Sequence, residues 1–283
     1  MKISYIQNND CRSTETRITY NLIDEFKKNG IDVLVNECTS DCDFIICLNG
    51  LSQYVLFEQI RTQYPHIKTI MYVWDLYTWT KYATGYDNIQ YYTEIWTPSY
   101  EVILRLNELY NINPNKCKVI KCYAELFEDV DNICTNGGYV YHFARDYVDK
   151  HLGWTSQACT ELGIPLVRTT HGLSFDEYKK TVLQCSFLVL EYEEASTGGL
   201  TMIEGYYHGK NVLFSDSIYQ GGRDYFGDRA YYFSNYDDFK TKIKMLYEAS
   251  SNSIELSDRK HFCMQYTKSE MINRILKQLN KLL

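Results

Sequence analysis

Short apolar segments alternate with amphipathic helical segments along the chain, and this alternation restricts the folds that the sequence can adopt. The segments KISYI (2–6) and DFIICL (43–48) have the length and composition of buried strands. Between them, apolar residues recur at helical spacing in TRITYNLIDEFKKN (16–29), and Gly30 follows as a helix C-cap. Strands that alternate with helices of this length predict a mostly parallel sheet with crossover helices.

The same pattern occurs twice, and a polar segment separates the two halves. A second cycle starts at the strand-like YVYHFA (139–144), after EDVDNICTNGG at 128–138, which is acidic, ends in glycines and is typical of a linker. The length of 283 residues suits two domains of ordinary size. We therefore expect an α/β protein with two Rossmann-like domains that face each other across a cleft. The expected boundaries are 1–130, 138–265 and, for a C-terminal helix that packs back across the domains, 266–283.

Composition and charge argue against several classes of protein. The net charge of -7 disfavours general nucleic-acid binding, although an acidic protein can carry a local basic cleft. The ten cysteines form no C-x-x-C pair, and their closest spacings, Cys38/Cys42/Cys47 and Cys117/Cys122, have no nearby histidine, so no metal site is predicted. The sequence shows no secretory signal, no disulfide framework and no run near the ~20 apolar residues of a membrane span. We expect a cytoplasmic protein without a transmembrane segment.

The segment 191–229 holds the first candidate site. A strand ends there in a carboxylate-rich turn that passes through Ser196, Gly198 and Gly199 into a helix. A glycine turn at a helix N-terminus offers backbone N–H groups and a positive dipole end, which suit a diphosphate. Glu204, about one and a half turns into this helix, can accept hydrogen bonds from a ribose diol. The alternative is an ordinary strand–turn–helix with a solvent-facing glutamate.

A second candidate site follows the first strand of the second half. In HFARDYVDKHLGW, Arg145 and Lys150 lie five residues apart at a strand–helix junction. Two cations at this place can neutralise a diphosphate, including one that leaves during a reaction. The alternative is a pair of surface charges at the start of a helix.

These segments resemble the donor-binding half of glycosyltransferase family four, which carries G-R-x-x-x-x-K-G and, later, E-x7-E. HFARDYVDKHLGW is similar to the first motif, and GGLTMIEGYYHGKNVLFSD followed by GGRDYFGDRAYYF is similar to the second and to the strand and G-G-x-x-E-Y-like loop after it. The resemblance implies that Glu204 binds the donor ribose and that backbone amides at Gly199 and Leu200 meet the distal phosphate and sugar. It also implies that Arg145 and Lys150 bind the diphosphate.

Further donor contacts follow from the same resemblance. Strict counting places Ser196 at the first glutamate of E-x7-E, while Glu194 lies two residues earlier, so either residue is a candidate for the sugar contact. The stretch RTTHGLSFDEYKK resembles the turn and helix that precede the donor segment in the family. The backbone near His171 and Leu173 is therefore expected to face the nucleotide base.

The first half departs from the family pattern at two places. The glycine-rich loop before the first helix is replaced by DCRSTET, where Thr14 and the following Arg17 are candidate phosphate or acceptor contacts. The frequent His-Asp pair after the fourth strand reads Trp74-Asp75, and Asp75 either orients donor or acceptor or caps a helix. Trp74 and Tyr77 belong to an aromatic segment that either stacks on acceptor sugars or covers the sheet.

The resemblance implies an enzyme that transfers a hexose-like sugar, with retention, from a UDP- or GDP-sugar to a hydroxyl group. The nucleotide-sugar is the donor substrate and no cofactor is expected. Since no D-x-D motif follows a strand, and Arg145 with Lys150 can supply the charge of a divalent ion, we expect a metal-independent reaction. The alternatives are a catalytically silent nucleotide-sugar-binding module and a transferase that modifies a hydroxylated base in DNA. The acceptor stays open among a glycan, a lipid-linked sugar, a small molecule and a modified DNA base.

Overall fold

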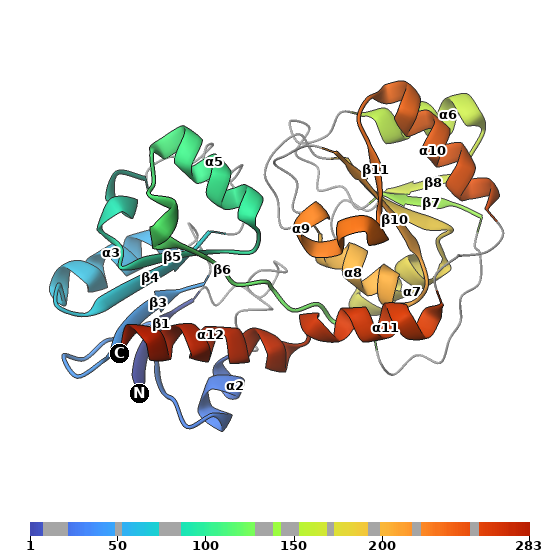
Figure 1. Ribbon diagram of the computed structural model, residues 1–283. Helices are drawn as coiled ribbons and strands as arrows, with labels where there is room; N and C mark the ends of the chain where they lie inside the picture. The colour runs from blue at the N-terminus through green and yellow to red at the C-terminus, as the bar shows by residue number, and fades with distance from the viewer. Residues whose placement is uncertain are drawn as a thin grey trace. The chain divides into compact units, whose positions relative to one another are not determined.

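The computed structural model divides into two compact α/β units (Figure 1). Unit 1 consists of residues 1–123 and 268–283, and unit 2 consists of residues 124–267. The structure describes residues 1–7, 22–48, 53–73, 86–127, 138–142, 153–168, 173–191, 199–216, 222–249 and 255–283.

Unit 1 is built on a six-stranded sheet with the order β2-β1-β3-β4-β5-β6, in which every neighbouring pair is parallel. Its central strands are buried on both faces, as near-continuous apolar runs predict for a parallel sheet covered by helices. The strands are β1 (Lys2–Ile6), β2 (Asp32–Val35), β3 (Phe44–Cys47), β4 (Lys68–Tyr72), β5 (Glu94–Thr97) and β6 (Cys117–Val119).

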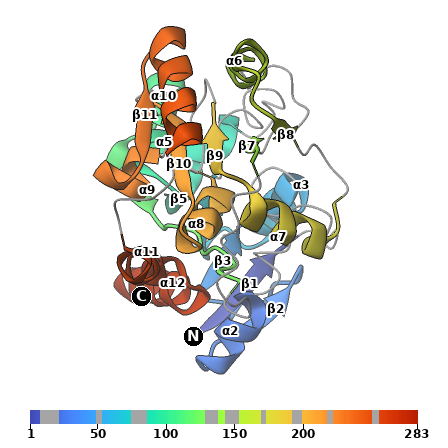
Figure 2. The same ribbon diagram turned by 90° about the vertical axis from the view of Figure 1, so that its right-hand side faces the viewer.

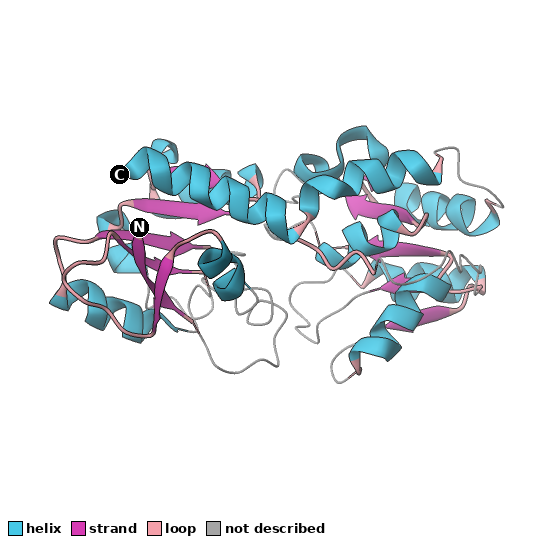
Figure 3. Ribbon diagram, turned by 90° about the horizontal axis from the view of Figure 1, so that it is seen from below, coloured by secondary structure: helices cyan, strands magenta, loops and turns pink. Residues whose placement is uncertain are grey.

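Helices cover both faces of this sheet. The α-helices are α2 (Leu22–Lys28), α3 (Tyr54–Gln63), α5 (Tyr100–Tyr110) and α12 (Lys268–Leu282), and the 3₁₀ turns are η2 (Tyr86–Tyr91) and η3 (Pro114–Lys116). Helix α12 packs against α2 on one face, while α3 and α5 lie on the other (Figures 1 and 3). In α12 the buried residues recur at helical spacing, which is why the sequence pattern reveals this helix; they are Met271, Ile272, Ile275, Gln278 and Leu279.

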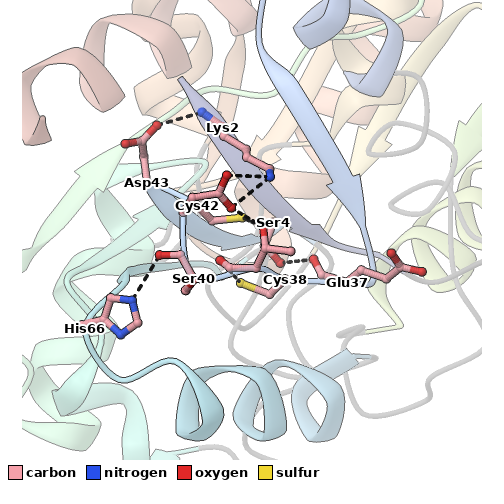
Figure 4. Close-up of polar contacts among 10 residues, drawn as sticks. Lys2, Ser4, Glu37, Cys38, Ser40, Cys42, Asp43 and His66 are labelled. Carbon is pink, nitrogen blue, oxygen red and sulfur yellow. Dashed lines mark hydrogen bonds and ion pairs between the residues drawn. The ribbon is translucent and has the colours of Figure 1, made fainter.

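Polar contacts replace a crossover helix between β2 and β3 (Figure 4). The connection, residues 36–43, lies against β1, where the Ser4 hydroxyl donates to the carbonyl of Glu37 at 2.7 Å. Its far end is held by the Lys2 backbone N–H, which donates to the Asp43 carboxylate at 2.8 Å. These bonds satisfy the Glu37 carbonyl and the Lys2 N–H and tie the connection to β1.

Unit 2 is built on a five-stranded parallel sheet with the order β11-β10-β9-β7-β8. Side chains along β9 alternate between two cores: Leu188 and Leu190 face one, and Phe187 and Val189 face the other. The strands are β7 (Val140–His142), β8 (Leu166–Arg168), β9 (Phe187–Leu190), β10 (Asn211–Ser215) and β11 (Tyr231–Phe233).

Each core of unit 2 is covered by its own helices. Helices α7, α8 and α11 contribute to one core, and α6 and α10 to the other (Figure 2). The helices are α6 (Trp154–Leu162), α7 (Phe175–Gln184), α8 (Leu200–Tyr207), α9 (Gly222–Phe226), α10 (Tyr236–Glu248) and α11 (Leu256–Cys263), with 3₁₀ turns η5 (Gly227–Arg229) and η6 (Met264–Tyr266).

The predicted fold class is confirmed, since both units are parallel α/β sheets covered by helices. Helices α9 and α11 were not expected. Helix α11 buries only Arg259 and Cys263, so it carries little apolar periodicity for a sequence pattern to reveal. None of the helices in the described part of the chain is both long enough and apolar enough to cross a bilayer.

The chain enters unit 2 at Ala124, before the segment 128–138 that the sequence suggests as a linker. The Ala124 backbone N–H donates to the carbonyl of Tyr266 at 2.9 Å. Leu126 and Phe127 are buried in a core of unit 2. Of the linker segment 128–138, only Gly138 lies within the described residues.

Candidate functional site

The carboxyl ends of the unit 2 strands define the region in which a ligand is expected, because parallel α/β sheets bind ligands beyond these ends. Among the predicted site residues, the structure describes Gly199, Leu200, Glu204 and Leu173. The others lie outside the described residues: Arg145, Lys150, Asp75, Ser196, Glu194, Gly198, His171, Thr14, Arg17, Trp74 and Tyr77.

Gly199 occupies the turn between β9 and α8, as the sequence predicts. Its φ of +74° is in the left-handed region, and α8 begins at the next residue, Leu200. A Cβ at this position would lie 3.0 Å from Met202 Cγ and 3.1 Å from Leu190 Cδ2. The backbone conformation therefore favours glycine, and a side chain here would also crowd Met202 and Leu190.

Glu204 lies inside unit 2 and not on its surface. Its side chain is 4% exposed, in a helix whose residues 201–207 are all buried. One carboxylate oxygen accepts a hydrogen bond from the Tyr178 hydroxyl, and the other accepts from the backbone N–H of Glu125 at 3.3 Å. The Tyr178 hydroxyl also lies 2.8 Å from Thr201 Oγ1. The solvent-facing alternative for Glu204 is therefore wrong.

A buried carboxylate is costly unless hydrogen-bond donors compensate for the lost water. The donors to Glu204 among the described residues include a phenol and a backbone amide, both neutral. Burial and the nearby Glu204 carboxylate raise the pKa of Tyr178 well above its usual value, so this phenol remains a donor at neutral pH. Helix α7 positions it, and the start of α7 is fixed by a capping box in which Ser174 and Glu177 bond each other's backbone N–H.

Helix α8 is seated directly on the sheet. A Cβ on Gly205 would lie 2.4 Å from Leu188 Cδ1, so only glycine allows the helix to approach β9 this closely. No motif in the sequence points to Gly205, Tyr178 or Thr201. The capping box S-x-x-E is visible in the sequence and indicates where α7 begins, but the contact from Tyr178 to Glu204 joins residues that only the tertiary fold brings together.

The segment that enters unit 2 lies against the same helices. Phe127 has a φ of +49°, which is unusual for a bulky residue, and its ring stacks on His208 with centroids 5.8 Å apart. His208 Nε2 lies 2.9 Å from the carbonyl of Leu126. Burial lowers the pKa of His208, which favours the neutral imidazole. These contacts hold the Glu125 backbone N–H where Glu204 accepts from it.

A second buried carboxylate, Glu191, directly follows β9 and is 1% exposed. It accepts a hydrogen bond from the Thr155 backbone N–H in the first turn of α6 at 2.8 Å. His142, the last residue of β7, is fully buried, and its Nε2 lies 3.9 Å from the same carboxylate. Burial raises the pKa of Glu191 to about 7, against the opposing effect of the α6 backbone N–H. No motif in the sequence points to Glu191 or His142.

The stretch GGRDYF, which resembles a loop of the family, forms helix α9 from Gly222 onward. A Cβ on Gly222 would lie 2.8 Å from Phe214 Cγ, so the glycine lets α9 rest on β10. Arg223 Nε pairs with Asp216 Oδ1 at 2.6 Å, just after β10, and the guanidinium lies 4.2 Å from the centre of the Tyr232 ring.

Among the described residues, no group of three or more His, Cys, Asp or Glu side chains could hold a metal ion.

The chain is similar to several solved structures. No family model and no curated protein matches it. HepE from Anabaena, solved with UDP and glucose, aligns over 99% of this chain and 100% of its own, with 11% identity and a TM-score of 0.72. TarM from S. aureus, solved with UDP, aligns over 86% of this chain and 56% of its own, with 12% identity and a TM-score of 0.64. The pneumococcal O-GlcNAc transferase GtfA, solved with UDP and GlcNAc, aligns over 92% and 59%, with 15% identity and a TM-score of 0.58.

At these identities the likeness establishes the fold. The chain has the two Rossmann-like domains of the GT-B type, and it matches HepE over essentially the whole of both chains. It spans little more than half of TarM and of GtfA.

Proposed function

We propose that the protein is a glycosyltransferase that transfers a sugar from a nucleotide-diphosphate sugar to a hydroxyl acceptor. The observation that carries this proposal is the buried Glu204 on α8, directly after the glycine turn that follows β9. This is the edge of the sheet where a nucleotide is expected. The GT-B fold, shared with proteins solved with UDP, supports the same reading and favours UDP as the nucleotide.

In this proposal the start of α8 holds the donor. The backbone at Gly199 and Leu200 faces the distal phosphate and sugar, where the helix dipole favours negative charge. Glu204 accepts hydrogen bonds from the ribose diol. An ionised carboxylate accepts at about four positions, so protein donors and ribose hydroxyls can share it. Tyr178 and the Glu125 backbone fix its orientation in advance.

The remaining contacts are assigned from the sequence resemblance. Arg145 and Lys150 stabilise the diphosphate as its bond to the sugar breaks, and Asp75 orients donor or acceptor. Sugar recognition belongs to Glu194 or Ser196, and the base lies against the backbone near His171 and Leu173. The acceptor side consists of Thr14, Arg17, Trp74 and Tyr77.

The transfer proceeds with retention and without a metal ion. The bond from the anomeric carbon to the diphosphate breaks, and the acceptor oxygen bonds to the same face of the sugar. The departing diphosphate oxygen takes the acceptor proton. Because Arg145 and Lys150 carry the charge that a divalent ion would supply, the diphosphate leaves as an anion paired with protein cations.

A panel of nucleotide-sugars tests this proposal. The protein is incubated with UDP-glucose, UDP-N-acetylglucosamine and GDP-mannose together with candidate glycan acceptors, and the release of nucleoside diphosphate is measured. We expect release from at least one donor, with full activity in excess EDTA. Tight donor binding without release would instead indicate a silent binding module, and strict dependence on magnesium or manganese would contradict the metal-independent mechanism.

A further inference from the structure

A hollow of about 680 Å³ lies on unit 2, where α11 packs against α8 (Figure 1). Its volume is within the range of ~300–1,000 Å³ that is usual for ligand pockets. All of its lining residues belong to α8, α11 and the 3₁₀ turns η5 and η6, and Tyr206, Asp228, Arg229, Asp258, His261 and Phe262 are among them.

This hollow and the proposed donor site lie on different sides of α8. Glu204 bonds Tyr178 of α7, whereas Tyr206 packs against Phe262 of α11. Residues two positions apart on a helix do not share a face. A ligand in the hollow therefore does not compete with the ribose that Glu204 is proposed to hold.

Tyr206 brings a buried hydroxyl group to the hollow. Tyr206 is 1% exposed, and its hydroxyl has no hydrogen-bond partner among the described residues. Its ring is held edge-on by Phe226 and Phe262, with ring centres 5.4 and 5.7 Å away, and the Arg259 guanidinium lies 4.4 Å from the ring centre. Burying a hydroxyl without a hydrogen bond is costly, and native structures pair most such groups. A ligand that bonds this hydroxyl would offset that cost.

Charged side chains of both signs surround the hollow without neutralising one another. In the described part of the chain, no ion pair joins Arg229 to Asp228 or Asp258. The Arg229 guanidinium instead lies 4.7 Å from the centre of the Phe262 ring, which leaves the N–H groups in its plane for a ligand. With the buried Arg259 beside them, two carboxylates face two guanidinium groups. The hollow therefore carries no excess of positive charge that would favour a phosphate.

We infer that this hollow binds a neutral oligosaccharide, a segment of the acceptor, at a site separate from the donor site. A sugar hydroxyl both donates and accepts, so one sugar ring can bond carboxylates, a guanidinium and a phenol together. An apolar ligand would instead leave these groups without hydrogen bonds. The inference rests on the proposed function and sharpens it, because it assigns a glycan among the possible acceptors. A second contact of this kind raises the effective concentration of the chain at the enzyme.

The test measures binding of maltohexaose, cellohexaose, chitohexaose and mannohexaose by calorimetry, with and without saturating UDP. We expect at least one of them to bind with the same affinity in both conditions, because the sites are separate. Arg229→Gln and Asp258→Asn should each lose about tenfold in affinity, as for a hydrogen bond to a charged group. Tyr206→Phe should lose roughly threefold, as for a neutral hydrogen bond.

Two controls separate binding from packing. The Tyr206 hydroxyl has no partner within the described structure, so Tyr206→Phe without sugar should unfold at the wild-type temperature or above it. Asp237→Asn changes an exposed acid at the start of α10 and is the matched control for Asp258→Asn; it should keep the wild-type affinity.

Three outcomes would overturn the inference: no binding of any of the four sugars, displacement of the bound sugar by UDP, or wild-type affinity in both Arg229→Gln and Asp258→Asn. Each of them leaves the proposed function intact if nucleoside diphosphate is still released from the donor panel. Sugar binding without any such release would overturn the proposed function and leave a glycan-binding protein.

Discussion

Two buried glutamates, one in each unit, have similar surroundings but different positions. Glu94 of unit 1 is 6% exposed and accepts from Trp96 Nε1 at 2.8 Å and from Gln278 Nε2 at 2.7 Å. Glu204 of unit 2 is 4% exposed and also accepts from neutral donors. Glu94, however, begins a strand, whereas Glu204 lies on the helix that follows the carboxyl end of a strand.

This difference shows that burial and hydrogen bonding do not by themselves identify a ligand-binding acid. Glu94 joins α12 to β5 through Gln278, at the amino end of its strand, where parallel sheets do not place their ligands. Glu204 and Glu191 lie at the other side of their sheet, where the carboxyl ends of the strands meet. If position at the carboxyl ends of the strands decides function, substitutions there should alter donor binding or turnover. Substitutions of Glu94 should alter stability alone.

The largest effect is expected for the cations assigned to the carboxyl edge of unit 2. Arg145→Ala or Lys150→Ala should reduce kcat/KM by about 2–4 kcal/mol in transition-state terms, because preorganised charge on the leaving diphosphate is lost. Steady-state kinetics with the best donor of the panel measures this loss. Lys240→Ala, which removes an exposed partner of Glu161, serves as the control and should be nearly neutral. Near-normal activity in both test variants would remove these cations from the site.

The next effect concerns the pH dependence of stability. The pKa of Glu191 is raised from 4.5 to about 7 in the folded protein, so the folded state holds a proton that the unfolded state has lost. The stabilising contribution is complete below pH 4.5 and is lost as pH rises to 7, by about 3 kcal/mol. Glu191→Gln should lack this decline and be more stable than the wild type at pH 8. Urea unfolding at a series of pH values measures it, and identical pH profiles for the two proteins would contradict the assignment.

A direct comparison of Glu204 with Glu94 uses the same substitution, glutamate to glutamine, at both positions. The amide retains an acceptor oxygen but loses the charge, so binding of UDP and of UDP-glucose should weaken by similar factors, about 1.5–3 kcal/mol for a charge-assisted bond. Glu194→Ala should instead weaken only the sugar-bearing ligand. Glu94→Gln is the matched control and should change the melting temperature without changing either affinity. Unaltered UDP binding in Glu204→Gln would show that α8 has been aligned wrongly with the donor site.

The smallest effect is expected for Tyr178→Phe, which removes one donor to Glu204 and leaves the ring in place. UDP affinity should fall by about 1 kcal/mol, because the carboxylate loses part of its fixed orientation. The double variant with Glu204→Gln should lose less than the sum of the two single changes, since the residues act through one contact. Additive losses in calorimetry would separate Tyr178 from the donor site.

Local signals in the sequence predicted the features that depend on neighbouring residues. The glycine turn and the helix that follows it were predicted correctly, because a glycine between a buried strand and an apolar helix is visible in the sequence. The fold class followed in the same way from alternating strands and helices. Helix α9 was not predicted, since GGRDYF is short and its glycines are typical of a loop.

Contacts between distant residues could not be predicted. Glu204 accepts from Glu125, which lies 79 positions earlier in the chain, and from Tyr178, which lies 26 positions earlier. Glu191 has the sequence appearance of an exposed turn residue, because it is followed by further acids in EYEEAS. Its burial depends on α6 and β7, which approach it only in the folded unit.

The position of α12 has a consequence for the order in which the protein is assembled. This helix belongs to unit 1 but follows the whole of unit 2 in the chain, so unit 2 is an insertion between β6 and α12. The ends of the insertion meet, since Ala124 bonds Tyr266. During synthesis, unit 2 is complete before Gln278 exists to pair with Glu94. Unit 1 therefore cannot be complete before unit 2 has been synthesised, and its buried acid stays without that partner until the insertion has been made.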